Sequence, residues 1–167
     1  KLFRHHVLSN VFYEEGHLID DEFFTYQGVM NARKIVYIPT VVYNYRQRAS
    51  SVMKDRSTIQ RRCEDIFAFL EKRRKDVSAR FPELTSVYDN HYADYLLYLP
   101  ESELGTKKTI KEIKKRLIRH VADGKLLLWK KGQRQLTLRV LSFLAMPTRI
   151  RKRGKDGAKD NGYEFFK

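Results

Sequence analysis

The chain has 167 residues, of which 34 are Lys or Arg and 20 are Asp or Glu, so its formal net charge is +14 at pH 7. Hydrophobic residues make up 42% of the chain, which is enough to build a core and excludes wholesale disorder. The single cysteine, Cys63, excludes an internal disulfide framework and any cysteine-based zinc cluster. No apolar run approaches the roughly 20 residues that a membrane-spanning helix needs.

The first 53 residues mix helical and extended patterns. Apolar residues recur at near-helical spacing over residues 19–32, and the first turn of this segment is acidic, which predicts a helix. Two runs rich in β-branched and aromatic residues follow at 34–38 and 41–45, with Pro39 and Thr40 between them. They predict a strand pair.

Residues 54–147 have the periodicity of helices. A capping-box pattern at residues 57–60 precedes a helix with one apolar stripe, and Pro82 separates this helix from the next. The stripe consists of Ile59, Cys63, Ile66, Phe67 and Leu70. The stripe of the second helix is expected to run from Leu84 and Val87 to Leu99.

A third helix is expected to begin after Thr106 and to end at Asp123-Gly124. Its apolar face is predicted to hold Ile110, Ile113, Leu117, Ile118 and Val121. A fourth segment spans residues 126–146, and residues 148–167 read as a basic flexible tail. The whole is therefore predicted to be an α+β chain that is mostly helical.

Two clusters of reactive groups flank the predicted strand pair. The acidic cluster is Asp20, Asp21 and Glu22, and the basic, hydroxyl-bearing cluster is Arg46, Arg48 and Ser51. A carboxylate can accept a proton from an attacking hydroxyl, and guanidinium groups with a hydroxyl can hold a diphosphate leaving group. If both clusters meet in one cleft, they supply two parts of a group-transfer reaction.

Four pieces of the chain, in this order and spacing, resemble the end of the catalytic domain of family 2 glycosyltransferases, which are inverting enzymes of the GT-A fold. These pieces are residues 1–3, 20–26, 34–39 and 43–52. The resemblance implies that Asp21 is the base that deprotonates the acceptor hydroxyl, with Asp20 standing where the family usually has Glu. It also implies that Arg46, Arg48 and Ser51 lie near the donor diphosphate.

The resemblance further implies that residues 1–53 are the C-terminal part of a GT-A-like catalytic domain, 54–147 a helical extension and 148–167 a tail. The nucleotide-binding half of such an enzyme, with its Asp-x-Asp metal motif, is expected to precede Lys1, and no Asp-x-Asp occurs in these residues. A divalent metal, Mg²⁺ or Mn²⁺, is expected for the complete enzyme, with no metal ligands in this chain. The 167 residues alone are expected to be inactive.

The implied substrates are a nucleotide-sugar donor and a glycan or lipid-linked acceptor, as in the synthesis of capsule, exopolysaccharide or cell-wall glycans. The expected location is the cytoplasm, with peripheral contact at the inner face of the cell membrane as an open alternative. The basic amphipathic stretch 107–119 and the run 140–153 favour such contact with anionic lipid.

Other interpretations stay open at this point. The acidic cluster can simply stabilise a helix start, and Arg46, Arg48 and Ser51 can be ordinary loop residues. A different class of function is a basic helical module that binds nucleic acid or an anionic membrane, although no known nucleic-acid-binding motif is present. A homo-oligomer formed through the helical part is a third interpretation.

Overall fold

The computed structural model describes residues 1–41, 43, 44, 46, 55–124 and 134–147. Within these ranges the chain forms five α-helices joined by loops and short 3-10 turns, which confirms the prediction of a mostly helical chain. The helices are α1 (Asp20–Asn31), α2 (Ile59–Arg80), α3 (Thr85–Tyr98), α4 (Lys107–Ala122) and α5 (Arg134–Ala145). The predicted tail, 148–167, lies outside the described residues.

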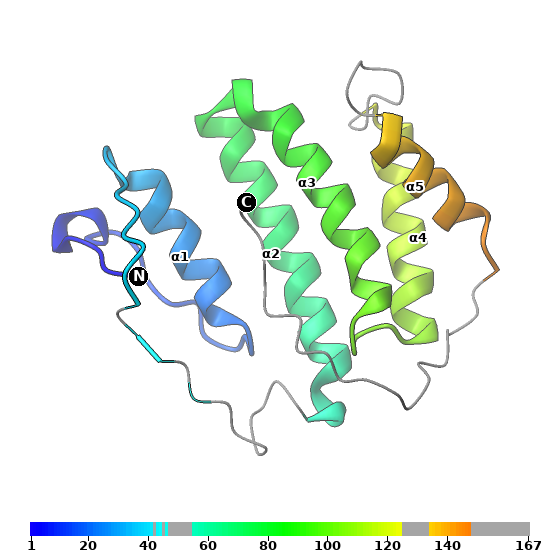
Figure 1. Cartoon of the computed structure of the whole chain (residues 1–167), viewed down its shortest axis with the longest axis horizontal. Helices are drawn as coiled ribbons and strands as arrows, with labels where there is room; N and C mark the ends of the chain where they lie inside the picture. The colour runs from blue at the N-terminus through cyan, green and yellow to red at the C-terminus, as the bar shows by residue number, and fades with distance from the viewer. Residues whose placement is uncertain (42, 45, 47–54, 125–133, 148–167) are drawn as a thin grey trace.

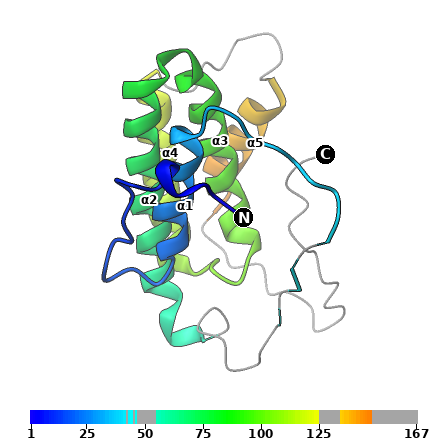
Figure 2. The same ribbon diagram turned by 90° about the vertical axis from the view of Figure 1, so that its left-hand side faces the viewer.

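The strand pair predicted at residues 34–38 and 41–45 is not found in the described part of the chain. Residues 34–41 have no regular secondary structure apart from a bend at Thr40, and Figure 2 shows this segment standing away from the helices. Its composition favours a strand, but a strand needs a hydrogen-bonded partner strand, and the described residues contain none. Val42 and Tyr45 of the second run are outside the described residues.

The helix ends follow local hydrogen-bonding chemistry. The Thr106 hydroxyl accepts a hydrogen bond from the Thr109 amide at 3.1 Å and caps α4, as predicted. At the other end of α4, Gly124 has φ of +66°, a left-handed conformation that glycine adopts without steric cost. The capping box predicted at residues 57–60 is wrong, because the carboxylate of Asp55 takes the Ser57 amide at 2.8 Å and caps the 3-10 turn Arg56–Thr58 instead.

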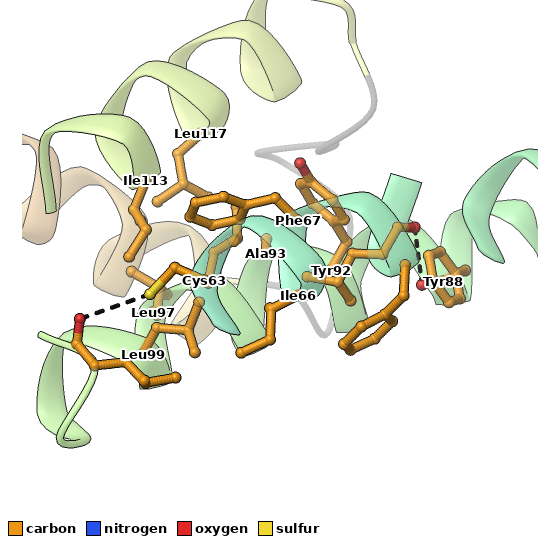
Figure 3. Packing of buried hydrophobic residues seen from close by; sticks show 14 of the residues in the cluster. Cys63, Ile66, Phe67, Tyr88, Tyr92, Ala93, Leu97, Leu99, Ile113 and Leu117 are labelled. Carbon is orange, nitrogen blue, oxygen red and sulfur yellow. Dashed lines mark hydrogen bonds between the residues drawn. The ribbon is translucent and has the colours of Figure 1, made fainter. Parts of the chain in front are cut away.

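The helices form one continuous assembly. Helices α1, α2 and α3 lie side by side, with α4 and α5 beyond α3, and each packs on its neighbours in that order (Figure 1). One buried cluster runs through the assembly from Phe23 of α1 to Val140 of α5. Its centre, where α2, α3 and α4 meet, is drawn in Figure 3. The helical part is thus held by a shared apolar core.

Cys63 belongs to this core, as predicted from its place on the α2 stripe. Its thiol lies 3.5 Å from the hydroxyl of Thr109, and burial raises the pKa of the thiol. A buried thiol with a raised pKa is a poor nucleophile. Cys63 is therefore a packing residue.

The predicted apolar faces of α3 and α4 include residues that the structure leaves exposed. Ile118 is 57% exposed although Leu117 beside it is fully buried, and Val87 of α3 is 62% exposed. Successive helical residues point about 100° apart, so only the neighbouring helix decides which edge of a wide stripe is covered. No helix lies over these edges in the described part of the chain.

The neighbouring pair on α4 provides a matched test of the core. Leu117→Ala should lower the free energy of unfolding by about 2–5 kcal/mol, because it leaves a cavity between helices. Ile118→Ala should change it by about 0.5 kcal/mol or less, because that side chain is mostly exposed. Denaturant unfolding of both variants measures this, and equal losses would contradict the placement of α4.

Candidate functional site: the acidic start of helix α1

The loop before α1 is fixed by a buried carboxylate of α2. Asp65 accepts a hydrogen bond from the Leu18 amide at 2.6 Å, and its other oxygen lies 2.9 Å from Nδ1 of His17. The His17 ring stacks on Phe23 at 4.1 Å between centroids. Arg61 also donates to the carbonyl of Gly16 at 2.7 Å. These contacts determine where α1 begins and so where its acidic first turn lies.

Helix α1 then runs parallel to α2. Three polar contacts join the helices, from Arg73 to Glu22, from Tyr26 to Asp76 and from Arg80 to Asn31, at 2.6, 2.5 and 2.6 Å. The residue numbers of the bonded pairs increase together along α1 and α2, so the two helices point in the same direction. Burial and the bond to Asp76 raise the pKa of Tyr26, so this phenol stays neutral. The side of α1 that faces α2 is therefore structural.

The three predicted acidic residues have different surroundings. The carboxylate of Glu22 is bound by Arg73, whose guanidinium also contacts the Glu22 carbonyl at 3.2 Å and lies over the ring of Phe69 at 4.9 Å. Asp20 and Asp21 are exposed, and within the described ranges no Lys, Arg or His side chain lies within ion-pair distance of either one. Glu22 is thus used for packing, whereas Asp20 and Asp21 face solvent.

Asp21 has the electrostatic property expected of a proton acceptor. Desolvation raises the pKa of its carboxyl, and the adjacent charges of Glu22 and Asp20 raise it further. Backbone amides of the first turn act in the opposite direction without cancelling the effect. A carboxylate with a raised pKa binds a proton more strongly, which suits a general base.

An aromatic pair lies on the same side of α1 as Asp20. The ring of Phe24, one helical turn after Asp20, stacks on Tyr13 with centroids 4.2 Å apart. Tyr13 is 56% exposed, so the pair forms part of the surface near the acidic turn. Such a surface can pack against the apolar face of a ring-shaped ligand.

The structure brings the acidic residues together, but it does not bring the basic cluster to them. Arg46 is exposed and makes no hydrogen bond or ion pair with the rest of the described chain. Arg48 and Ser51 lie outside the described residues. A hollow of about 790 Å³ along α2 is lined by residues between Glu71 and Ala79 and includes none of the predicted site residues.

The described residues do not offer a metal centre. They contain no group of three or more His, Cys, Asp or Glu side chains arranged to hold a metal ion. His17 is engaged by Asp65, and Asp20 and Asp21 have no further ligand beside them. The Mg²⁺ or Mn²⁺ expected for the complete enzyme, with its ligands outside this chain, therefore stays a prediction. Nor is any helix among them both long and apolar enough to cross a membrane.

Asp65 and Arg73 are the functional supports that sequence reasoning missed. Both lie on α2, far along the chain from the residues that they hold. The available signal was the apolar Phe69, which lies one helical turn after Asp65 and one turn before Arg73, on a side of α2 outside the predicted stripe. A charged residue in such a position is buried only when it has a partner.

Comparisons with family models, curated proteins and solved structures gave no match to this chain. Its function is therefore argued from its own residues.

The raised pKa of Asp21 leads to a prediction that distinguishes two roles of its carboxylate, a general base and a helix cap. Because folding raises the pKa of Asp21, the charged carboxylate is less favourable in the folded state than in the unfolded state. The free energy of unfolding therefore falls as the pH rises through the pKa that Asp21 has in the folded protein. Asp21→Asn should thus be as stable as the parent below the ordinary pKa of 3.8 and more stable at neutral pH. Melting temperatures across this pH range measure the difference.

Glu22→Gln is the matched control for this measurement, because it removes a charge that Arg73 binds. It should lower the melting temperature at neutral pH. If Asp21→Asn also loses stability there, the carboxylate of Asp21 is a helix cap rather than a group held at a cost.

A second pair of variants tests how the acidic turn is positioned. Asp65→Ala leaves the Leu18 amide without its acceptor and should lower the free energy of unfolding by about 1–3 kcal/mol. Glu64→Ala, at the exposed neighbouring position, should have little effect. Amide hydrogen exchange at residues 18–22 should accelerate in the first variant only, and unchanged exchange there would refute the role of Asp65.

Proposed function

We propose that these residues are the C-terminal portion of a glycosyltransferase that moves a sugar from a nucleotide-sugar donor to a glycan or lipid-linked acceptor. The observation that carries the proposal is the difference among the three acids. Glu22 is held by Arg73, whereas Asp21 is exposed, has no cationic partner in the described residues and has a raised pKa. Asp21 is the proposed base, with Asp20 as the carboxylate beside it.

The proposed chemistry is a single displacement. The carboxylate of Asp21 accepts the proton of an acceptor hydroxyl as that oxygen forms a bond to the anomeric carbon of the donor. The bond from this carbon to the diphosphate breaks, the nucleoside diphosphate leaves with the electron pair, and the configuration inverts. Arg46, Arg48 and Ser51 are proposed to hold the leaving diphosphate. No step is assigned to a metal, because the described residues offer no ligand set.

The exposed segment 34–41 supports the proposal that another part of a catalytic domain belongs beside these residues. Its side chains would point alternately to the two faces of a strand, yet Ile35, Val36, Tyr37 and Ile38 are all 62–86% exposed. A strand that is apolar on both faces is typical of a central position in a sheet covered on both sides. We infer that this segment, which has no regular secondary structure in the described chain, forms a strand only when it pairs with a sheet that the described residues do not contain.

The helical part supplies the support in this proposal. Residues 54–147 form the extension, and α2 within it holds α1 through Asp65 and Arg73. The acidic turn is thereby fixed to the shared core, while the segment 34–41 extends away from it (Figure 2). A base held in one position favours group transfer, because the reacting groups must meet in a defined geometry.

The decisive test is a transfer assay on the longest natural reading frame that contains these residues. Release of nucleoside diphosphate is measured with a panel of nucleotide sugars and a cell-envelope glycolipid extract as acceptor. Asp21→Asn should lower the rate by roughly 10²–10⁴-fold, because a general base contributes about that factor.

Asp20→Asn and Glu22→Gln are the controls. Both should retain most of the transfer rate, since neither is the proposed base. Near-normal transfer by Asp21→Asn, or loss confined to Asp20→Asn, would reject the assignment of Asp21. Absence of diphosphate release with every donor would reject the proposed function itself.

A further inference from the structure

The outer face of α4 is a row of cations without counter-charges. Helix α4 contains seven Lys or Arg residues and a single acidic residue, Glu112, which pairs with Arg116 at 3.1 Å. The exposed cations are Lys107, Lys108, Lys111, Lys115 and Arg119. Among the described residues, none of these five has an acidic side chain within ion-pair distance. Burial of Ile113 and Leu117 on the opposite side fixes this row toward solvent.

Apolar side chains are exposed next to this row. On α5, Leu138 and Leu141 are 55% and 47% exposed, and Met146 just after the helix is 60% exposed. On α4, Ile118 is 57% exposed. Val140 on the inner side of α5 is fully buried, so the two leucines are on the outer side of a helix that is already packed. They do not serve the core.

Contacts between the helices place the two sets on one face. The ammonium of Lys114 lies 3.0 Å from the carbonyl of Leu144 and over the ring of Phe143, so the middle of α4 meets the end of α5. The two helices run in opposite directions (Figure 1). Ile118 lies one turn after Lys114 on α4, and Leu141 lies about one turn before Leu144 on α5. Because the helices are antiparallel, Ile118 and Leu141 are displaced from this contact in the same direction along the interface. On the far side of α5, Arg139 pairs with Asp94 of α3.

We propose that this α4–α5 face binds the surface of an anionic lipid bilayer. The lysines of α4 would contact headgroup phosphates, and Ile118, Leu138 and Leu141 would enter the boundary between headgroups and acyl chains. A nucleic acid would also bind the cations through its phosphates, but phosphate contacts do not remove the neighbouring exposed leucines from water. Bilayer binding is measured without any sugar, so its outcome is independent of the proposed transferase activity.

The test is co-sedimentation of the 167-residue chain with vesicles of phosphatidylcholine alone or mixed with phosphatidylglycerol. Binding is expected only to the anionic vesicles and should weaken as salt is added. The variant Lys108→Glu, Lys111→Glu, Lys115→Glu should lose at least about tenfold in affinity. The control Arg33→Glu, Arg56→Glu, Lys75→Glu has the same change in net charge at exposed positions outside α4 and should lose far less.

The apolar part is tested by Leu138→Ser with Leu141→Ser, which should weaken vesicle binding severalfold and leave the binding of a DNA duplex unchanged. Circular dichroism of each variant shows whether the helices are retained. If both charge variants lost the same affinity for anionic vesicles, net charge alone would explain the binding, and the proposal would be overturned. Tighter binding of the duplex than of the vesicles, with no effect of the serine substitutions on vesicle binding, would assign the face to nucleic acid instead.

Discussion

The buried carboxylate of Asp65 is the interaction on which the candidate site depends. Removing a carboxylate from water is costly unless its oxygens receive hydrogen bonds, and here the Leu18 amide and the His17 ring lie beside them. Satisfying Asp65 therefore brings the loop before α1 onto α2 at one position. From that position Glu22 reaches Arg73, and the exposed side of the same turn is left to Asp20 and Asp21.

Much of the helical fold could be predicted from the sequence, because helix caps and apolar periodicity are local. The hydroxyl of Thr106 caps the start of α4, and Gly124, which has no Cβ, takes the left-handed conformation just after its end. The capping box at residues 57–60 failed locally, because Asp55 caps the preceding turn. The other failures depended on distant partners. The run 34–38 has the composition of a strand, but pairing is a property of two segments, and Ile118 fits an apolar stripe that no neighbour covers. The acidic cluster of α1 was found from the sequence itself, and the resemblance assigned the base to Asp21. The difference between Glu22, which Arg73 binds, and Asp21, which pairs with no cation among the described residues, required the position of Arg73.

The two proposals concern opposite ends of one assembly. The acidic turn lies on α1, and the cationic face lies on α4 and α5, with α2 and α3 between them (Figure 1). Because one buried cluster connects all five helices, a bilayer bound at α4 and α5 would hold the acidic turn at a defined distance from the lipid surface. An acceptor that is anchored in the same bilayer would then meet the base within a limited range of heights.

The parallel course of α1 and α2 has a mechanical consequence for the chain between them. The connection must return along the length of α1, about 18 Å for its 12 residues. Residues 32–58 make this return, and a chain of that length reaches on the order of 90 Å when extended. The extra length follows the segment 34–41, whereas only Ala32 and Arg33 separate that segment from the end of α1. A sheet that includes this segment would therefore lie close to the end of α1, and the number of residues before α2 leaves its position relative to α2 unconstrained.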